Sequence, residues 1–195
     1  MAAPLTPDDL MSLEAYARAR TEFRRRVMAH KAHRRVVLGE HLTLIFEDRL
    51  TIQYQVQEML RAERIFEEEG IREELDAYNP LIPDGRNWKA TLMLEYPDED
   101  ERRVRLQELI GIEDRVWVRV AGHARVQAIA DEDLEREDAE KTSSVHFLRF
   151  ELDPGMIAAF KEGAPLALGV DHERYVAMLD PVAAETRAAL LADLD

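Results

Sequence analysis

Apolar positions in the first 80 residues recur with the three-to-four-residue spacing of α-helices. Thr6 and Pro7, followed by two acidic residues, form a favourable helix start, because threonine caps, proline suits the first turn and acids complement the dipole. Longer helices are expected over residues 13–33, 50–66 and 71–78. Two strands, 34–38 and 41–46, are expected between the first two, joined by a tight turn. The pattern therefore predicts a helical N-terminal block over about residues 7–79.

The rest of the chain alternates apolar and polar residues with the two-residue period of strands. Strands are expected over residues 88–96, 116–120, 124–129, 145–152, 166–170 and 175–179. Helices are expected over 99–110 and 154–160, and Asp180-Pro181 is expected to cap a terminal helix. The acidic tract at residues 131–138 has the composition of an exposed loop or a frayed helix.

Strands joined by short turns, with helices at both ends, predict an α+β fold. We expect a mostly antiparallel sheet with an N-terminal helical block and a C-terminal helix. No linker rich in glycine, serine or proline divides the chain, so residues 1–195 are expected to form a single domain. Its strand-rich part is placed at about 86–180 and its terminal helix at about 181–194.

Charge is unevenly distributed along the chain. The 26 basic and 40 acidic side chains give a net charge of −14. Residues 18–35 carry eight bases and one acid, a local charge of +7, so the remainder carries −21. Because so acidic a protein is repelled by phosphate-rich surfaces, we expect neither nucleic acid nor membranes among its partners.

Cysteine is absent, which excludes disulfides, thiolate metal sites and thiol chemistry in this chain. The opening residues, MAAPLTPDDL, have neither the basic leader nor the apolar core of a signal peptide. No uncharged stretch approaches the roughly 18 apolar residues of a membrane span. A cytoplasmic location is therefore expected.

Two of the expected helices carry charge on faces that should be apolar. At 100° per residue, Glu63 falls about 20° from Ile52, within the apolar stripe of its helix. That stripe consists of Ile52, Val56, Met59, Leu60 and Phe66. The opposite side carries a second cluster of Tyr54, Glu58 and Arg61. A carboxylate buried in such a stripe has to be paired, hydrogen-bonded or protonated.

The preceding helix shows the same conflict, because Arg20, Arg24 and Lys31 interrupt its apolar stripe. We expect the two helices to pack so that Arg20 or Arg24 meets Glu58 or Glu63, since the arginine fork can bind a carboxylate at two points. One interpretation is an ion-pair network that fixes helix register. The other is a polar pocket for an anionic or metal-linked ligand. Its candidate ligand-binding residues are Arg20, Arg24, Tyr54 and Arg61, and its candidate catalytic acid–base groups are Glu58 and Glu63.

Other chemistry is weakly indicated. His30, His33 and His41 make a metal site conceivable, but the first two equally suit the negative end of a helix dipole. The sequence has no HExxH motif and no Glu-x-x-His pair of the di-iron kind, so we expect no metal, and the cofactor is unknown. Trp88 and Trp117 are expected in the core, and His146 is expected to be partly buried.

Residues 34–39 (RRVVLG) and 41–49 lead into residues 54–64 (YQVQEMLRAER), and residues 78–83 (YNPLIP) follow after a spacer. This series resembles an uncharacterised bacterial family, domain of unknown function 3501, over nearly the whole chain. Residues 57–63 (QEMLRAE) are its most specific part, and the acidic tract falls in a variable region.

The family has no established activity, so the resemblance supplies no mechanism. Its members are often encoded beside rubrerythrin-like proteins and iron–sulfur oxidoreductases, which implies a link to bacterial redox or peroxide-stress systems. The leading hypothesis is a non-catalytic accessory or interaction protein that serves a rubrerythrin-like or iron–sulfur partner through its charged surface. The alternative is a small-molecule enzyme or binder that uses the Arg/Glu pocket. Homo-oligomerisation is compatible with either.

Overall fold

The computed structural model describes residues 3–130 and 141–195, and these residues form two four-stranded sheets. The first sheet has the order β1 (Arg35–Leu38), β2 (Leu42–Phe46), β3 (Asn87–Leu94), β6 (Val145–Glu151). The second has the order β5 (Val126–Gln127), β4 (Val116–Val120), β7 (Leu166–His172), β8 (Tyr175–Leu179). All ladders between neighbouring strands in the two sheets are antiparallel. The helices are α1 (Leu13–Ala32), α2 (Arg49–Glu63), α3 (Glu68–Tyr78), α4 (Glu99–Glu108), α5 (Pro154–Lys161) and α6 (Ala184–Leu191).

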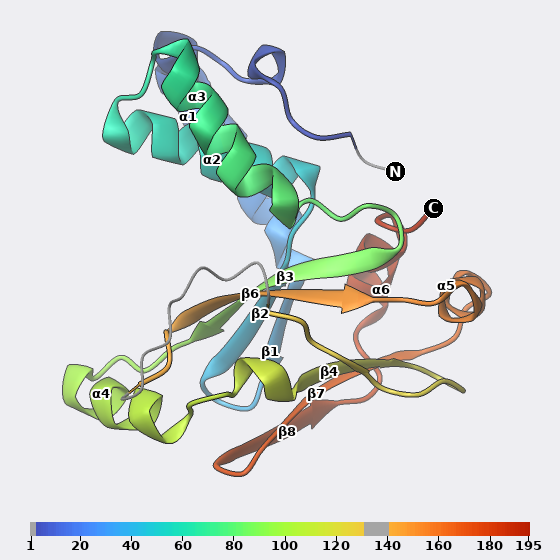
Figure 1. Cartoon of the computed structure of the whole chain (residues 1–195). Helices are drawn as coiled ribbons and strands as arrows, with labels where there is room; N and C mark the ends of the chain where they lie inside the picture. Colours follow the sequence, from blue (N-terminus) through green and yellow to red (C-terminus); the bar gives the residue numbers. More distant parts are fainter. Residues whose placement is uncertain (1–2, 131–140) are drawn as a thin grey trace.

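The expected α+β class is confirmed, and the strands form two sheets where one was expected. The sheets face each other across the main hydrophobic core (Figure 1). In β6 the inward residues are His146, Leu148 and Phe150, each at most 2% exposed. Trp88 is also buried, and its ring packs edge-on against Phe160 of α5 at 5.1 Å between centroids. The expected core position of Trp88 is therefore confirmed, and His146, expected to be partly buried, is fully buried.

Helices α1, α2 and α3 form an arm that projects from one end of the first sheet (Figure 1). The base of the arm is fixed by covalent connectivity, since α1 leads into β1 and α2 follows β2. Ser12 and Asp48 cap α1 and α2 by accepting hydrogen bonds from backbone N–H groups three residues later. The arm has its own small core, formed by Leu5, Ile52, Val56, Leu60, Leu75, Leu81 and Ile82.

Several expected boundaries are wrong. Helix α2 ends at Glu63, because Arg64 adopts a left-handed conformation with φ of 58°, and Phe66 is 70% exposed outside the apolar stripe. The terminal helix is capped at Ala183, whereas Asp180 accepts a hydrogen bond from Arg119 at 2.8 Å. Strand β5 has two residues where six were expected. The acidic tract at 131–138 lies outside the described residues.

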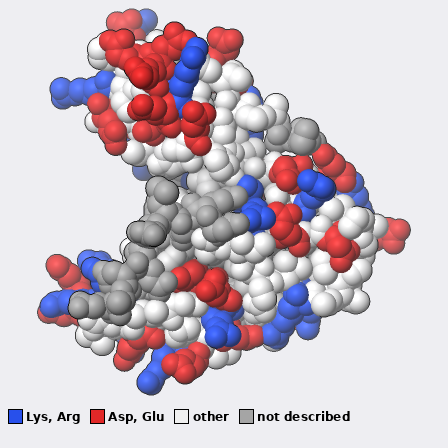
Figure 2. Space-filling model, viewed as in Figure 1, with Lys and Arg blue, Asp and Glu red and all other residues white. Residues whose placement is uncertain are grey.

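Acidic side chains gather over the outer part of the arm, where α3 lies (Figure 2). In the part of the chain that the structure describes, no helix combines the length and the apolar character needed to cross a bilayer.

Candidate functional site

Helices α1 and α2 bring Arg20 and Glu58 together on the arm. The Arg20 Nε donates to Glu58 Oε1 at 2.8 Å, and Arg20 Nη2 donates to Glu58 Oε2 at 2.7 Å. Both side chains are partly buried, at 30% and 24% exposure. The two-point geometry fixes the position of one helix along the other, because both hydrogen bonds require a single alignment of guanidinium and carboxylate. The expected contact between these helices is therefore present.

Two tyrosines complete this cluster. The Tyr16 hydroxyl donates to Glu58 Oε1 at 2.5 Å, and Tyr54 lies beside the same carboxylate. The Phe23 ring lies 6.1 Å from the rings of both tyrosines. Burial and the Glu58 charge raise the pKa values of both hydroxyls, so both stay protonated at neutral pH.

The electrostatics of Glu58 favour a permanent anion. Hydrogen bonds from Arg20, opposed by partial burial and assisted by Tyr16, lower the pKa of Glu58 to about 2 from its ordinary value of 4.5. A general acid or base works best with a pKa near the operating pH. The carboxylate is thus placed to hold the helices together, and its acidity does not suit proton transfer at neutral pH.

The structure does not bring the other candidate residues into this contact. Arg24 and Arg61 are exposed, and within the described residues neither forms a hydrogen bond or ion pair. Their charges act at longer range, Arg24 on Tyr54 and Arg61 on Glu58.

The expected burial of Glu63 is wrong. It is the last residue of α2 and it is exposed, because the helix ends just beyond the buried part of the stripe at Leu60. The pKa of Glu74, another acid, is raised by burial and then by the charge of Glu63. Glu63 therefore lines no buried Arg/Glu pocket.

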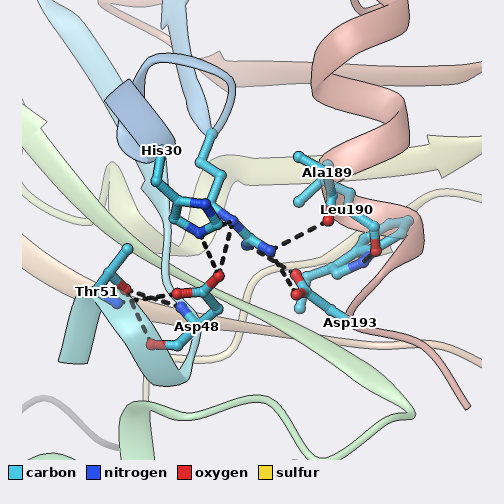
Figure 3. A network of polar contacts seen from close by, with 8 residues as sticks. His30, Asp48, Thr51, Ala189, Leu190 and Asp193 are labelled. Atoms are coloured by element: carbon cyan, nitrogen blue, oxygen red, sulfur yellow. Dashed lines mark hydrogen bonds and ion pairs between the residues drawn. The ribbon is translucent and has the colours of Figure 1, made fainter. Parts of the chain in front are cut away.

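A second polar network lies at the base of the arm, and no sequence pattern predicted it (Figure 3). Arg34 is only 2% exposed, and its guanidinium donates to Asp193 at 2.9 and 2.6 Å and to the Ala189 carbonyl at 3.1 Å. Its Nε lies 3.1 Å from Asp48 Oδ2, which His30 Nε2 approaches to 2.5 Å. Burial works to lower the pKa of Arg34, but the hydrogen bonds and charge of Asp193, together with the charges of Asp48 and Glu47, raise it overall.

This network joins three parts of the chain. Asp48 caps α2, Arg34 follows α1, and Asp193 follows α6. Burial acts to raise the pKa of Asp48, but the Arg34 charge and the Thr51 backbone N–H lower it overall. The only local signal was the Asp48/Thr51 capping pattern, because Arg34 and Asp193 are 159 residues apart.

Open hollows of about 320, 470 and 570 Å³ lie on the described surface, and none of these is lined by the candidate residues. The 470 Å³ hollow is bordered by His172, whose Nδ1 accepts from the Arg174 backbone N–H and whose Nε2 lies 3.1 Å from the Ile110 carbonyl. The described residues contain no group of three or more potential ligands placed to hold a metal ion. His30 instead contacts Asp48, and His41 stacks on Tyr96 with ring centroids 4.1 Å apart.

The fold and these contacts define a two-sheet α+β protein with a helical arm held by buried ion pairs. The chain belongs to the family described as "Protein of unknown function (DUF3501)", whose model matches residues 4–194. It is similar to a solved structure titled as a novel protein of unknown function from Burkholderia pseudomallei K96243, with 55% identity and a TM-score of 0.94. That match covers 99% of this chain and 100% of the other. No curated protein matches the chain.

Proposed function

We propose that this chain is a non-catalytic interaction protein that binds an electron-transfer partner, of the iron–sulfur or rubrerythrin-like class, through the outer end of its helical arm. The observation that carries the proposal is Phe66, a large aromatic side chain that is 70% exposed between α2 and α3. An exposed aromatic residue bordered by polar groups has the composition of a binding hot spot.

The surroundings of Phe66 give this surface its charge. Acidic residues of α3 line a shallow hollow of about 570 Å³, which also includes Arg72. Its acidic residues are Glu68, Glu69, Glu73 and Asp76. A partner with a basic patch next to an apolar pocket would complement this end of the arm, and such contacts weaken as salt screens the charges.

The state of the Arg20–Glu58 cluster supports a non-catalytic role. The Glu58 carboxylate of α2 is bound by Arg20 of α1, and its pKa of about 2 leaves it without a proton at neutral pH. The alternative function, a small-molecule enzyme or binder, needs a hollow lined by these side chains. The three hollows described above lie elsewhere.

The test is retention of an iron-containing protein from native cells on the immobilised chain. At low salt we expect an electron-transfer protein to bind, identified by mass spectrometry, iron content and visible absorbance, and to elute as salt rises. Phe66→Ser should abolish retention, whereas Val104→Ser, at a 52% exposed position on α4, should leave it unchanged. Retention of no iron-containing protein, or equal retention by both variants, would count against the proposal.

A further inference from the structure

Strand β8 is an open edge of the second sheet. It pairs with β7 on one side, and no described strand pairs with it on the other. The other sheet edges are shorter or covered: β5 has two residues, β1 has four, and Ile129 bridges to Arg149 on the outer side of β6. Unpaired edge strands present backbone donors and acceptors that are ready to pair with another chain.

The outward face of β8 is apolar in its middle and charged at its ends. Val176 and Met178 are 74% and 61% exposed, whereas the alternate residues Tyr175 and Ala177 pack against the main core. Proteins normally protect such an edge with a central charge or proline, and β8 has neither within its bounds. The charges stand just outside the strand, with Arg174 before it and Asp180 after it.

We infer that β8 pairs antiparallel with β8 of a second copy of this chain, about a two-fold axis at Ala177. In that register Val176 lies opposite Met178 of the other copy, and Arg174 lies opposite Asp180. The order of charge along the strand, basic, apolar, apolar, acidic, is thus complementary to itself when reversed. Two apolar contacts and two ion pairs form from one strand sequence, as a two-fold interface requires.

The same register allows the backbone groups of the two strands to form hydrogen bonds with each other. Antiparallel pairing needs residues of equal parity opposite each other, and pairing 176 with 178 meets that condition. Asp180 already accepts from Arg119 through Oδ2 at 2.8 Å, and a carboxylate can accept further hydrogen bonds. A five-residue strand buries less than the roughly 800 Å² per partner of a standard interface, so the dimer should be concentration-dependent.

The first test measures mass by sedimentation equilibrium over a wide range of protein concentrations. We expect the wild-type mass to rise from one to two chains as concentration increases. Met178→Lys should keep the protein monomeric by placing a charge opposite Val176, whereas Val104→Lys on α4 should dimerise as the wild type does. A wild type that stays monomeric at the highest concentration, or a Met178→Lys variant that dimerises normally, would overturn the inference.

The second test reads the register directly, and it uses the absence of native cysteine. Opposite residues in an antiparallel pair have Cα atoms about 4.5–5.5 Å apart, within disulfide range, whereas residues offset by two are about 7–8 Å apart. A mixture of Val176→Cys and Met178→Cys chains should therefore oxidise to a cross-linked dimer several-fold more than either variant alone. Equal cross-linking in all three samples would exclude this register. Both positions are exposed, so the substitutions should not prevent folding.

Discussion

Arg34 and Asp193 form a two-point ion pair that ties the base of the helical arm to the C-terminal segment. The guanidinium also reaches Asp48, so one buried cation compensates two carboxylates (Figure 3). Trp88 extends the link, because its indole N–H donates to the Leu190 carbonyl at 3.0 Å. The last residues of the chain are therefore part of the core structure.

Removing this cation should be strongly destabilising. Arg34→Leu leaves the buried Asp193 carboxylate without its cation and Asp48 with only His30 and Thr51, and losses of about 3–5 kcal/mol are typical of broken buried ion pairs. The free energy of unfolding from urea titrations would measure the effect. Arg25→Leu is the matched control, because Arg25 pairs with Glu22 at a site where both side chains are more than 70% exposed. Its loss should be far smaller than that of Arg34→Leu, because exposed ion pairs are screened by water, and similar losses for both variants would contradict the assigned role of Arg34.

Tyr175 connects the two sheets through its hydroxyl. Its Oη accepts from the His41 and Leu42 backbone N–H groups at 2.9 and 3.1 Å and donates to the Leu38 carbonyl at 2.7 Å. Tyr175→Phe should lower the free energy of unfolding by about 1–3 kcal/mol, because it leaves three groups of the β1–β2 turn without this partner. Urea unfolding of the variant beside wild type checks this. A variant as stable as wild type would show that water replaces the hydroxyl fully.

Gly39 offers a more specific test of the same contact. A Cβ at this position would lie 2.6 Å from the Tyr175 Oη, and its backbone φ is +70°. Gly39→Ala therefore combines backbone strain with a steric clash. In the Tyr175→Phe background the hydroxyl clash is removed, and the backbone strain and a 3.1 Å approach to the ring carbon Cζ are left, so the Gly39→Ala loss should be smaller there. Equal losses in the two backgrounds would mean that the hydroxyl does not confine the turn.

The Arg20–Glu58 contact was open to prediction from sequence because helical spacing is periodic. A charge within an apolar stripe, such as Arg20, requires a partner, and α2 offered two acids for it, Glu63 in its apolar stripe and Glu58 on the opposite side. The same helical spacing gave a wrong prediction for Glu63. The spacing gives the direction of a side chain around the helix axis, but it does not show how far along the axis the packing partner extends. Helix α2 passes beyond its buried contacts after Leu60, and the stripe meets solvent.

The spacing of apolar and polar residues does not show which distant segments of the chain pair. Alternation identified most of the strands, but it reports only that one face of a strand is buried, and that is equally true in one sheet or two. The pairing of β3 with β6, across more than fifty residues, depends on how the whole chain folds. The Arg34–Asp193 pair is a further case, because neither residue lies in a local pattern that distinguishes a buried ion pair from an exposed charge.

The effects of substitutions at Gly169 and Trp117 on the free energy of unfolding should depend on each other. Trp117 is fully buried on the outer side of the second sheet, under Arg125, whose guanidinium carbon lies 3.8 Å from the ring centroid. A Cβ on Gly169 would come within 2.3 Å of the indole. Gly169→Ala should therefore lower the free energy of unfolding by about 1–3 kcal/mol, as overpacking does. The loss should shrink in a Trp117→Leu background, and a loss that is unchanged there would place the strain elsewhere.

The Arg20–Glu58 pair predicts a defined dependence of stability on pH. The pKa of Glu58 is lowered to about 2 in the folded protein from an ordinary value of 4.5, so the folded state favours the ionised form. The resulting stability is complete above about pH 4.5 and is lost as the pH falls towards 2. Glu58→Gln, which keeps the shape but not the charge, should unfold about 1–2 kcal/mol more easily at pH 7, after allowance for partial solvent exposure. Urea titrations at pH 7, 4.5 and 2.5 should show this gap narrowing at the lowest pH, because Glu58 is then protonated in the unfolded chain and folding must release that proton. A gap that stays constant would mean that Glu58 contributes through packing rather than through its charge.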